Sequence, residues 1–425
     1  MKRLFASALV RDGAVAGAAN LLANGGSFVY YSAAAHALGP ATGGLFLALI
    51  AAALLISVFA NIAGVALTPD VARLHAANDR GGVRVLAGRA ALGWLASGIA
   101  LIVVALALTG PGESLFHLDD PVLLIETGAV VAANALLFLT RAFVQAIARF
   151  DVYAWSNVVE TILKAIAAGA IVAFPSLRLT IGSLAAVLAL SALFTAWPVF
   201  AYVRRARPVV PAFAQRSGVR SLIAAFSALA VMTFADGIIA RHMLAPFDAG
   251  LYNAAALAGR ALMSALGFLP LVILSKLAHD REESERGDRF FYAAVGACCL
   301  GAIAIFALFP TFILIAVGGR AYVAGAPLVA LYGIAASALS MTNVVVSYRI
   351  SRGARTIGRV LIVIAAAELA AMLVYHPSAA ALVDVLIAGH TLALVGSCLT
   401  GARPQRSRRA IDAQTGARSA GSSTT

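Results

Sequence analysis

The sequence predicts an all-α polytopic membrane protein with about twelve transmembrane helices in two six-helix, pseudo-symmetric halves. Hydrophobic residues make up 61% of the 425 residues and charged residues only 12%, whereas soluble domains carry about 25% charged residues. The apolar residues fall into runs of about 20, the length of a helix that crosses a bilayer. One stretch of the chain also occurs twice, which indicates two copies of one unit.

The repeated stretch is a hairpin of two apolar segments joined by a short turn of Gly and Pro residues. A shift of 206 residues aligns the copies without a gap, and it pairs identical residues at His36/His242, Leu38/Leu244, Pro40/Pro246, Gly44/Gly250, Leu45/Leu251, Ala48/Ala254, Ala52/Ala258 and Ala72/Ala278. Parallel repeats of this kind build transporters whose substrate path lies between the halves. His36 and His242 recur beside short turns, which indicates a structural role at an interface.

Twelve spans are predicted from the apolar runs, at residues 14–36, 43–67, 85–109, 121–140, 152–174, 179–202, 219–241, 249–275, 290–316, 321–347, 359–375 and 378–400. The predicted domains are an N-terminal half (residues 1–203), a cytosolic linker (204–218), a C-terminal half (219–400) and a tail (401–425). The tail is rich in Arg, Ser, Gly and Thr, and this composition predicts a disordered, basic cytosolic segment.

The distribution of cations predicts that both termini lie in the cytosol. With this orientation, 27 of the 32 Lys and Arg residues fall in cytosolic segments and their margins, including Arg141 at the end of the fourth span. The external loops hold only Arg178, Arg241 and Arg320, in agreement with the positive-inside rule. Arg241 is interpreted as a side chain that snorkels to the external rim.

Several functional classes find no support in the sequence. The net charge of +13 comes from Arg residues scattered between apolar runs and forms no single basic face, so a nucleic-acid partner is not expected. The chain has no phosphate-binding glycine loop, no HExxH motif and no nucleophile elbow, and its histidines do not cluster. Its external loops are short. We therefore expect no catalytic residue, no metal site and no enzymatic activity.

Lys164 and Arg260 are the two cations within predicted spans. Ionisable residues at membrane depth cost about 2.5 to 3.5 kcal/mol each, so they usually face a bundle interior or an aqueous path. Arg260 lies about 10 residues into its span, on the order of 15 Å deep, where the first copy has Leu54. It is a candidate anion site, whose face Asn253 and Ser264 continue. The alternative is an ion pair across helices with Asp236 or Glu368.

Glu160 and Lys164 lie one helical turn apart on the fifth span, in the favourable order for an ion pair. This pair either holds helices together or takes part in transport. Glu368 and Asp384 in the last two spans and Glu126 at the outer end of the fourth are candidates for binding a coupling proton or Na⁺, although each carboxylate alone is more often structural. The first span carries a polar stripe, which either lines a cavity or joins helices by hydrogen bonds; its members are Asn20, Asn24, Ser27 and Tyr31.

Two runs resemble signatures of bacterial polysaccharide flippases of the O-antigen and capsule type, the Wzx-type family. The first is LeuGlyProAlaThrGlyGlyLeuPhe at 38–46. The second, at 236–278, contains a LeuAlaPro turn, AlaGlyLeuTyr, Gly259-Arg260 and PheLeuPro at 268–270. This family is part of the multidrug/oligosaccharidyl-lipid/polysaccharide exporter (MOP) superfamily, together with the multidrug and toxin extrusion (MATE) transporters and the lipid II flippase.

The resemblance implies a V-shaped bundle that alternates between inward- and outward-open states. The implied substrate is an undecaprenyl diphosphate-linked oligosaccharide, moved across the bacterial inner membrane for lipopolysaccharide, capsule or exopolysaccharide assembly, with glycan polymerase and co-polymerase proteins as partners. Arg260 and Lys164 would bind the diphosphate, because a guanidinium donates two parallel hydrogen bonds to phosphate. Asn20, Asn24, Ser27, Asn253 and Ser264 would line the sugar cavity, and Asp236, Glu160 or Glu368 would tune the cycle. No cofactor is expected beyond a coupling Na⁺ or H⁺.

Two alternatives remain open from the sequence. The first is a Na⁺- or H⁺-coupled exporter of small molecules from the same superfamily, which predicts an acidic cavity lined by aromatic residues. The second is a membrane scaffold of an envelope glycan complex that transports nothing. An integral-membrane glycan polymerase is disfavoured because the sequence offers no large external loop.

Overall fold

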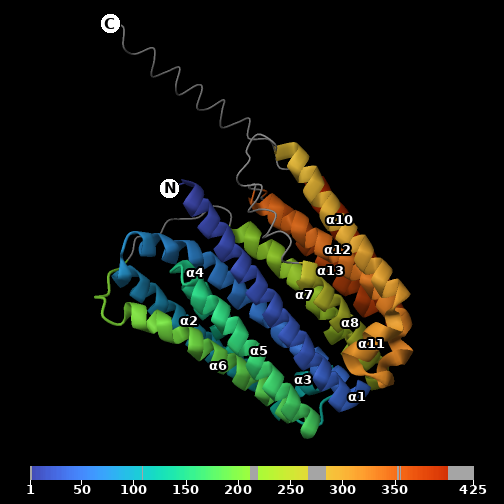
Figure 1. Cartoon of the computed structure of the whole chain (residues 1–425). Coiled ribbons are helices and arrows are strands. Elements are labelled where there is room, and N and C mark those ends of the chain that lie inside the picture. The colour runs from blue at the N-terminus through green and yellow to red at the C-terminus, as the bar shows by residue number, and fades with distance from the viewer. Residues whose placement is uncertain are drawn as a thin grey trace.

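The computed structural model describes residues 2–107, 109–210, 219–266, 284–351, 354 and 356–400, and in these ranges it contains helices and no β-strand. Figure 1 shows the helices gathered in one long bundle. Residues 211–218 of the predicted linker, residues 267–275 of the eighth span and the predicted tail lie outside the described residues.

The first half begins with two helical segments, labelled together as α1, that cover the first two predicted spans. α1 kinks where Gly39 adopts a left-handed backbone (φ 72°) directly before Pro40, and glycine adopts this conformation without steric cost. The turn predicted here is confirmed, because Gly39 interrupts the helical backbone and separates two helical segments that share the label α1. The elements of this half are α1 (Lys2–Ala76), α2 (Arg80–Ala107), α3 (Thr109–Phe116), α4 (Val122–Ala146), α5 (Phe150–Ala173) and α6 (Leu177–Val203).

The second half differs from the prediction in its ninth span. That span is broken at Phe309 into α10 and α11, which meet at an angle of 84°, and Pro310 is the first residue of α11. The elements of this half are α7 (Val219–Met243), α8 (Pro246–Leu266), α10 (Ser284–Leu308), α11 (Pro310–Gly318), the 3₁₀ helix η1 (Arg320–Gly325), α12 (Ala326–Ser351), α13 (Ile357–Val374) and α14 (Ala379–Leu399).

Each predicted span falls on a helical segment of the described chain, with α1 taking two of them. By length and composition alone, nine of the described helices can cross a membrane, with α1 counted once, and the bent pair α10/α11 would make a tenth. The short helix α3 was not predicted; it occupies the loop after the third span. The predicted all-α, polytopic fold class is confirmed.

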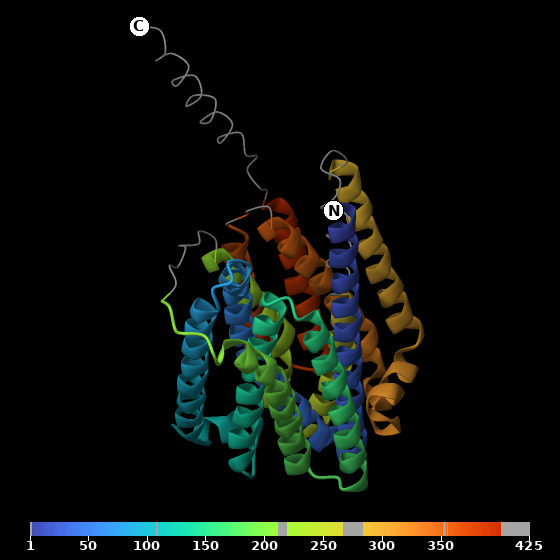
Figure 2. The ribbon, with the colours of Figure 1, turned by 60° about the vertical axis from the view of Figure 1, so that its left-hand side comes forward.

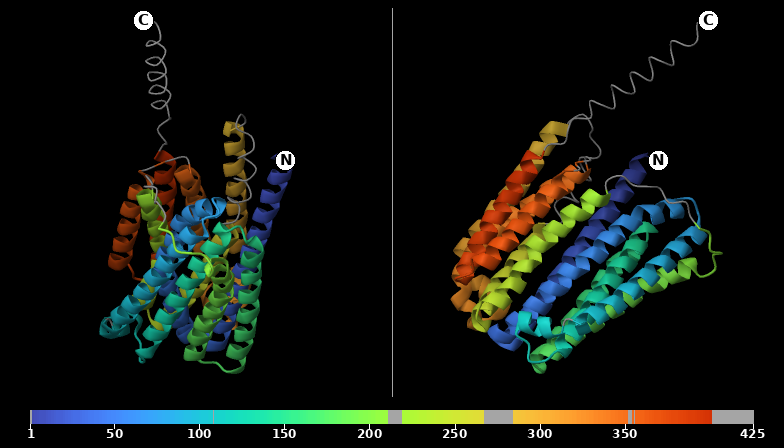
Figure 3. Two further views of the ribbon diagram at one scale, coloured as in Figure 1. Left: turned by 90° about the vertical axis from the view of Figure 1, so that its left-hand side faces the viewer. Right: turned by 180° about the vertical axis from the view of Figure 1, so that it is seen from behind.

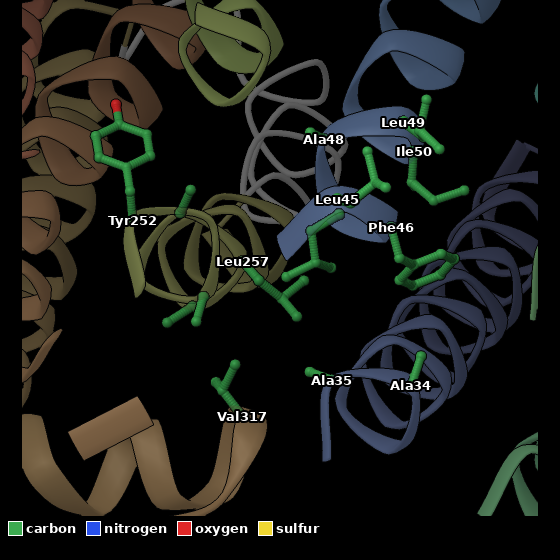
Figure 4. Close-up of a cluster of buried hydrophobic side chains, with 14 of the residues drawn as sticks. Ala34, Ala35, Leu45, Phe46, Ala48, Leu49, Ile50, Tyr252, Leu257 and Val317 are labelled. Carbon is green, nitrogen blue, oxygen red and sulfur yellow. The ribbon is translucent and has the colours of Figure 1, made fainter. Parts of the chain in front are cut away.

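The two halves share one hydrophobic core at the predicted external end. Figure 4 shows Ala35 and Leu45 of α1 near Leu257 of α8 and Val317 of α11. Toward the predicted cytosolic end the cores separate. One cluster contains residues of α1, α2, α4, α5 and α6, and another contains residues of α7, α12, α13 and α14. The bundle is thus a V whose arms meet at the external end, where α3 and α11 lie in Figure 1.

The contact between the halves is pseudo-symmetric. Repeat-equivalent glycines face each other, because a Cβ added to Gly44 would lie 2.9 Å from the Gly250 nitrogen. Tyr322 Oη donates to the Ala35 carbonyl (3.2 Å), and Arg241 Nε donates to the Phe116 carbonyl (2.9 Å). The same 206-residue shift relates these two bonds to each other. Arg241 is only 5% exposed, so it joins the halves and does not snorkel to the rim.

Two histidines at repeat-equivalent positions also contact the opposite half at this end of the bundle. His36 Nε2 lies 3.1 Å from the Ile315 carbonyl oxygen. His242 stacks on His117, with ring centroids 5.8 Å apart. The recurring pair His36 and His242 therefore lies at the interface between the halves. We call the contacts of Gly44, Gly250, Arg241, Tyr322 and these histidines the external closure.

We expect Gly250→Ala to weaken the external closure. A methyl group there would lie 2.6 Å from the Pro40 carbonyl carbon, and backbone cannot yield as a side chain can, so the halves must part. The expected result is increased water accessibility of a cysteine placed at position 35, measured by thiol labelling in membranes. Gly128→Ala on α4 is the control, since a Cβ there meets nothing within 4 Å. Unchanged labelling in Gly250→Ala would contradict the close packing.

Candidate functional site: two buried ionic clusters

The N-terminal half buries two cations around one carboxylate. Lys164 Nζ pairs with Glu160 Oε1, and Arg141 Nη2 lies 2.7 Å from Glu160 Oε2. Arg141 Nε also donates to Ser156 Oγ (2.9 Å), and Lys164 Nζ donates to Ser27 Oγ (2.7 Å). We call Arg141, Glu160 and Lys164 the N-cluster. With one carboxylate and two cations, it carries a formal excess of one positive charge.

Arg141 is the member of the N-cluster whose position differs from the sequence prediction. The fourth span was predicted to end at residue 140, with Arg141 in the cytosolic margin. α4 continues to Ala146, so Arg141 projects from within the helix and its side chain is only 12% exposed. The available signal was the apolar run that follows Arg141, which extends the helical pattern by one and a half turns.

The C-terminal half buries a carboxylate among an arginine and two tyrosines. Arg260 Nη2 lies 2.8 Å from Asp236 Oδ1, and Arg260 Nε donates to the Thr233 carbonyl (3.0 Å). Asp236 Oδ2 accepts from Tyr332 Oη (2.6 Å) and Tyr252 Oη (3.2 Å). Of the partners that the sequence left open for Arg260, the structure contains Asp236. We call Asp236, Tyr252, Arg260 and Tyr332 the C-cluster.

A second ionisable pair lies in the same half. His390 Nε2 of α14 lies 3.6 Å from Glu368 Oε1 of α13. The His390 ring nitrogens also lie 2.9 Å from the Ala335 carbonyl oxygen and 3.2 Å from that of Met232. Glu368 Oε2 is buried and has no hydrogen-bond partner in the described structure. The sequence indicated Glu368 and missed His390, which has no sequence neighbour that marks it as a partner.

The remaining polar candidates divide between the clusters and ordinary packing. Asn253 is fully buried, and its Nδ2 donates to the carbonyls of Gly237 (3.2 Å) and Ala249 (3.0 Å), so it ties α8 to α7. Ser264 is exposed. Asn20 and Asn24 are half-buried on α1. The structure therefore joins Ser27 to Lys164 and Asp236 to Arg260, whereas Lys164 and Arg260 belong to separate clusters.

The helical bundle is a fold that this chain shares with solved structures of transporters and of a lipid flippase. No family model and no curated protein matches the sequence. Among solved structures, the chain is similar to the lipid II flippase MurJ in an inward closed conformation, with a TM-score of 0.63 and 12% identity over 91% of this chain and 86% of that one.

It is also similar to a multidrug resistance MATE family transporter of the MOP superfamily in an inward-facing conformation. The TM-score is 0.61, with 13% identity over 90% of this chain and 92% of that one. For an outward-facing conformation of such a transporter the TM-score is 0.52, at 13% identity over 92% and 94% of the two chains.

Proposed function

We propose that this protein is a flippase that moves an undecaprenyl diphosphate-linked oligosaccharide across the bacterial inner membrane by alternating access, for surface polysaccharide assembly. The observation that carries the proposal is the excess positive charge of the N-cluster. A buried ionic site usually balances its charges, because an uncompensated charge away from water costs several kcal/mol. A site with one cation in excess suits an anionic ligand that completes the balance.

The proposed cycle assigns each cluster a role. The substrate enters from the cytosolic side, where each half has its own core, and its lipid tail stays in the bilayer. Its diphosphate binds at the N-cluster through Lys164 and Arg141. Arg260 joins the site when Asp236 releases it, so Asp236 tunes the affinity. Glu368, whose Oε2 lacks a hydrogen-bond partner in the described structure, takes up the coupling H⁺ or Na⁺. Asn20, Asn24 and Ser27 contact sugar.

The test of this proposal is Lys164→Met. It leaves Arg141 paired with Glu160, so the cluster becomes neutral and the fold is kept. We expect loss of at least tenfold in surface glycan when the variant complements a bacterial strain that lacks its own flippase, at an equal amount of protein in the membrane. Arg178→Met is the control, because Arg178 pairs with Asp120 at an exposed site in the predicted external region and should complement fully.

Wild-type surface glycan from Lys164→Met would refute the role of the excess charge. Glycan polymerase and co-polymerase partners, and a location in the inner membrane with both termini cytosolic, are part of the same proposal. Reporter fusions at both termini measure this orientation.

One observation favours a second candidate, a Na⁺- or H⁺-coupled exporter of small molecules. The cavity of such an exporter is expected to hold carboxylates among aromatic side chains. In the C-cluster, Asp236 accepts hydrogen bonds from two tyrosines, and the Arg260 guanidinium lies 5.5 Å from the Phe234 ring centroid. The same strains distinguish the two functions. An exporter would fail to restore glycan and would lower the accumulation of a cationic dye in cells.

A further inference from the structure

A cavity of about 530 Å³ lies between α2, α4 and α6, and none of its lining residues belongs to either ionic cluster. Its walls are almost wholly apolar: Ala87, Gly88 and Ala91 come from α2, Leu139 from α4, and Val199 and Phe200 from α6. Arg84 and Arg204 also line it, and they lie at the ends of α2 and α6 that face the predicted cytosol. The cavity therefore combines an apolar body with a cationic end.

The helix α2 leaves this cavity accessible to the bilayer. Its buried residues are confined to the first two turns, and its most apolar stretch has no buried residue. Figure 2 shows α2 at the edge of the bundle. Farther along the helix, Trp94 Nε1 donates to the Ala132 carbonyl of α4 (2.9 Å). α2 is thus held at its first two turns and at Trp94, but it is not packed between these two points, and a space remains. In a membrane, acyl chains fill an apolar space of this kind.

The cationic end has hydrogen-bond donors to offer. Arg84 Nη1 donates to the carbonyls of Ala206 (2.7 Å) and Arg204 (3.3 Å). These bonds hold the guanidinium in place beside the cavity. A guanidinium has five N–H donors, so Arg84 keeps three beyond those of Nη1. Basic pockets between transmembrane helices on the cytoplasmic side are where anionic lipid headgroups bind.

We propose that this cavity binds one phospholipid with an anionic headgroup, whose phosphate contacts Arg84 and Arg204 and whose acyl chain fills the space between α2, α4 and α6. The lipid supplies the packing that α2 lacks. The two arginines and the apolar body together favour a lipid of the cytosolic leaflet whose headgroup carries a net negative charge. The proposal does not depend on which substrate the protein transports.

The test uses the full-length protein in phosphatidylcholine vesicles, with spin-labelled lipids whose immobilised fraction is measured by electron paramagnetic resonance. Phosphatidylglycerol should bind more tightly than phosphatidylcholine. Arg204→Gln should lower this preference roughly fivefold, the effect of one arginine near the surface. Arg205→Gln is the matched control, because Arg205 is the exposed neighbour that does not line the cavity. Ala196→Trp, which keeps both arginines and fills the cavity, should remove the immobilised lipid.

Three results would overturn the proposal. The first is an equal preference in Arg204→Gln and in the wild type. The second is an equal loss in Arg205→Gln, which would indicate diffuse surface charge. The third is tighter binding of spin-labelled undecaprenyl phosphate than of phosphatidylglycerol, with loss in Ala196→Trp, which would assign the cavity to the tail of a transported lipid.

Discussion

Asp236→Asn is expected to destabilise the protein by about 3–5 kcal/mol, the usual cost of removing one partner of a buried ion pair. The Asp236 side chain is fully buried and accepts from Arg260, Tyr252 and Tyr332. An amide in its place leaves the guanidinium without a counter-charge. Thermal unfolding of the purified protein in detergent measures the effect, as a lower Tm than that of the wild type.

Two further variants separate stability from function. Asp248→Asn changes the same residue type at an exposed site on α8 and should alter stability by less than about 0.5 kcal/mol. Asp236→Leu combined with Arg260→Met leaves no unpaired charge and should recover much of the lost stability, while transport stays low. A wild-type Tm for Asp236→Asn would show that the ion pair contributes nothing.

Glu160→Gln is expected to have a comparable cost, again about 3–5 kcal/mol, because two buried cations then face each other without a carboxylate. Here a ligand can compensate. If the N-cluster binds a diphosphate, undecaprenyl diphosphate should raise the Tm of Glu160→Gln more than that of the wild type, since a ligand that binds only the native state stabilises it. Thermal unfolding with and without the lipid measures the difference.

The matched control lies on the same helix. Asp151 of α5 pairs with Arg149 at 2.9 Å, but both side chains are more than half exposed, and such pairs contribute about 0–1 kcal/mol. Asp151→Asn should therefore leave the Tm almost unchanged and should not respond to the lipid. An equal response of both variants to undecaprenyl diphosphate would place the binding site elsewhere.

Most of the helices could be predicted from the sequence, because the thickness of the bilayer sets the length of an apolar helix that crosses it. The predicted spans fall on described helices, apart from the broken ninth span and residues 267–275 of the eighth, which lie outside the described residues. The repeat-equivalent Gly44 and Gly250 lie where the structure brings the two halves together. The backbone details were harder to predict. Gly39 and Pro40 form the turn that the sequence predicts, whereas the break before Pro310 was not predicted, because whether a proline interrupts a span depends on tertiary packing.

The ionic clusters were predictable only where their members share a helix. Glu160 and Lys164 lie one turn apart, and the pair follows from that spacing. Arg141 reaches Glu160 from α4, and Tyr332 reaches Asp236 from α12, so these contacts depend on how helices cross, which local periodicity does not encode. The position of Arg260 was predicted, and its choice between Asp236 and Glu368 was not.

The contacts of the external closure involve repeat-equivalent residues, whereas the buried charged residues have no charged equivalents in the other repeat. Gly44 and Gly250 meet as equivalents, whereas the position equivalent to Arg260 is Leu54 and the position equivalent to Asp236 is Tyr30. Had the two halves remained separate copies of one gene product, a buried guanidinium could have been acquired only in duplicate, with twice the desolvation cost. Within one polypeptide, each half can carry its own buried charges, and the right-hand view of Figure 3 shows the two halves side by side.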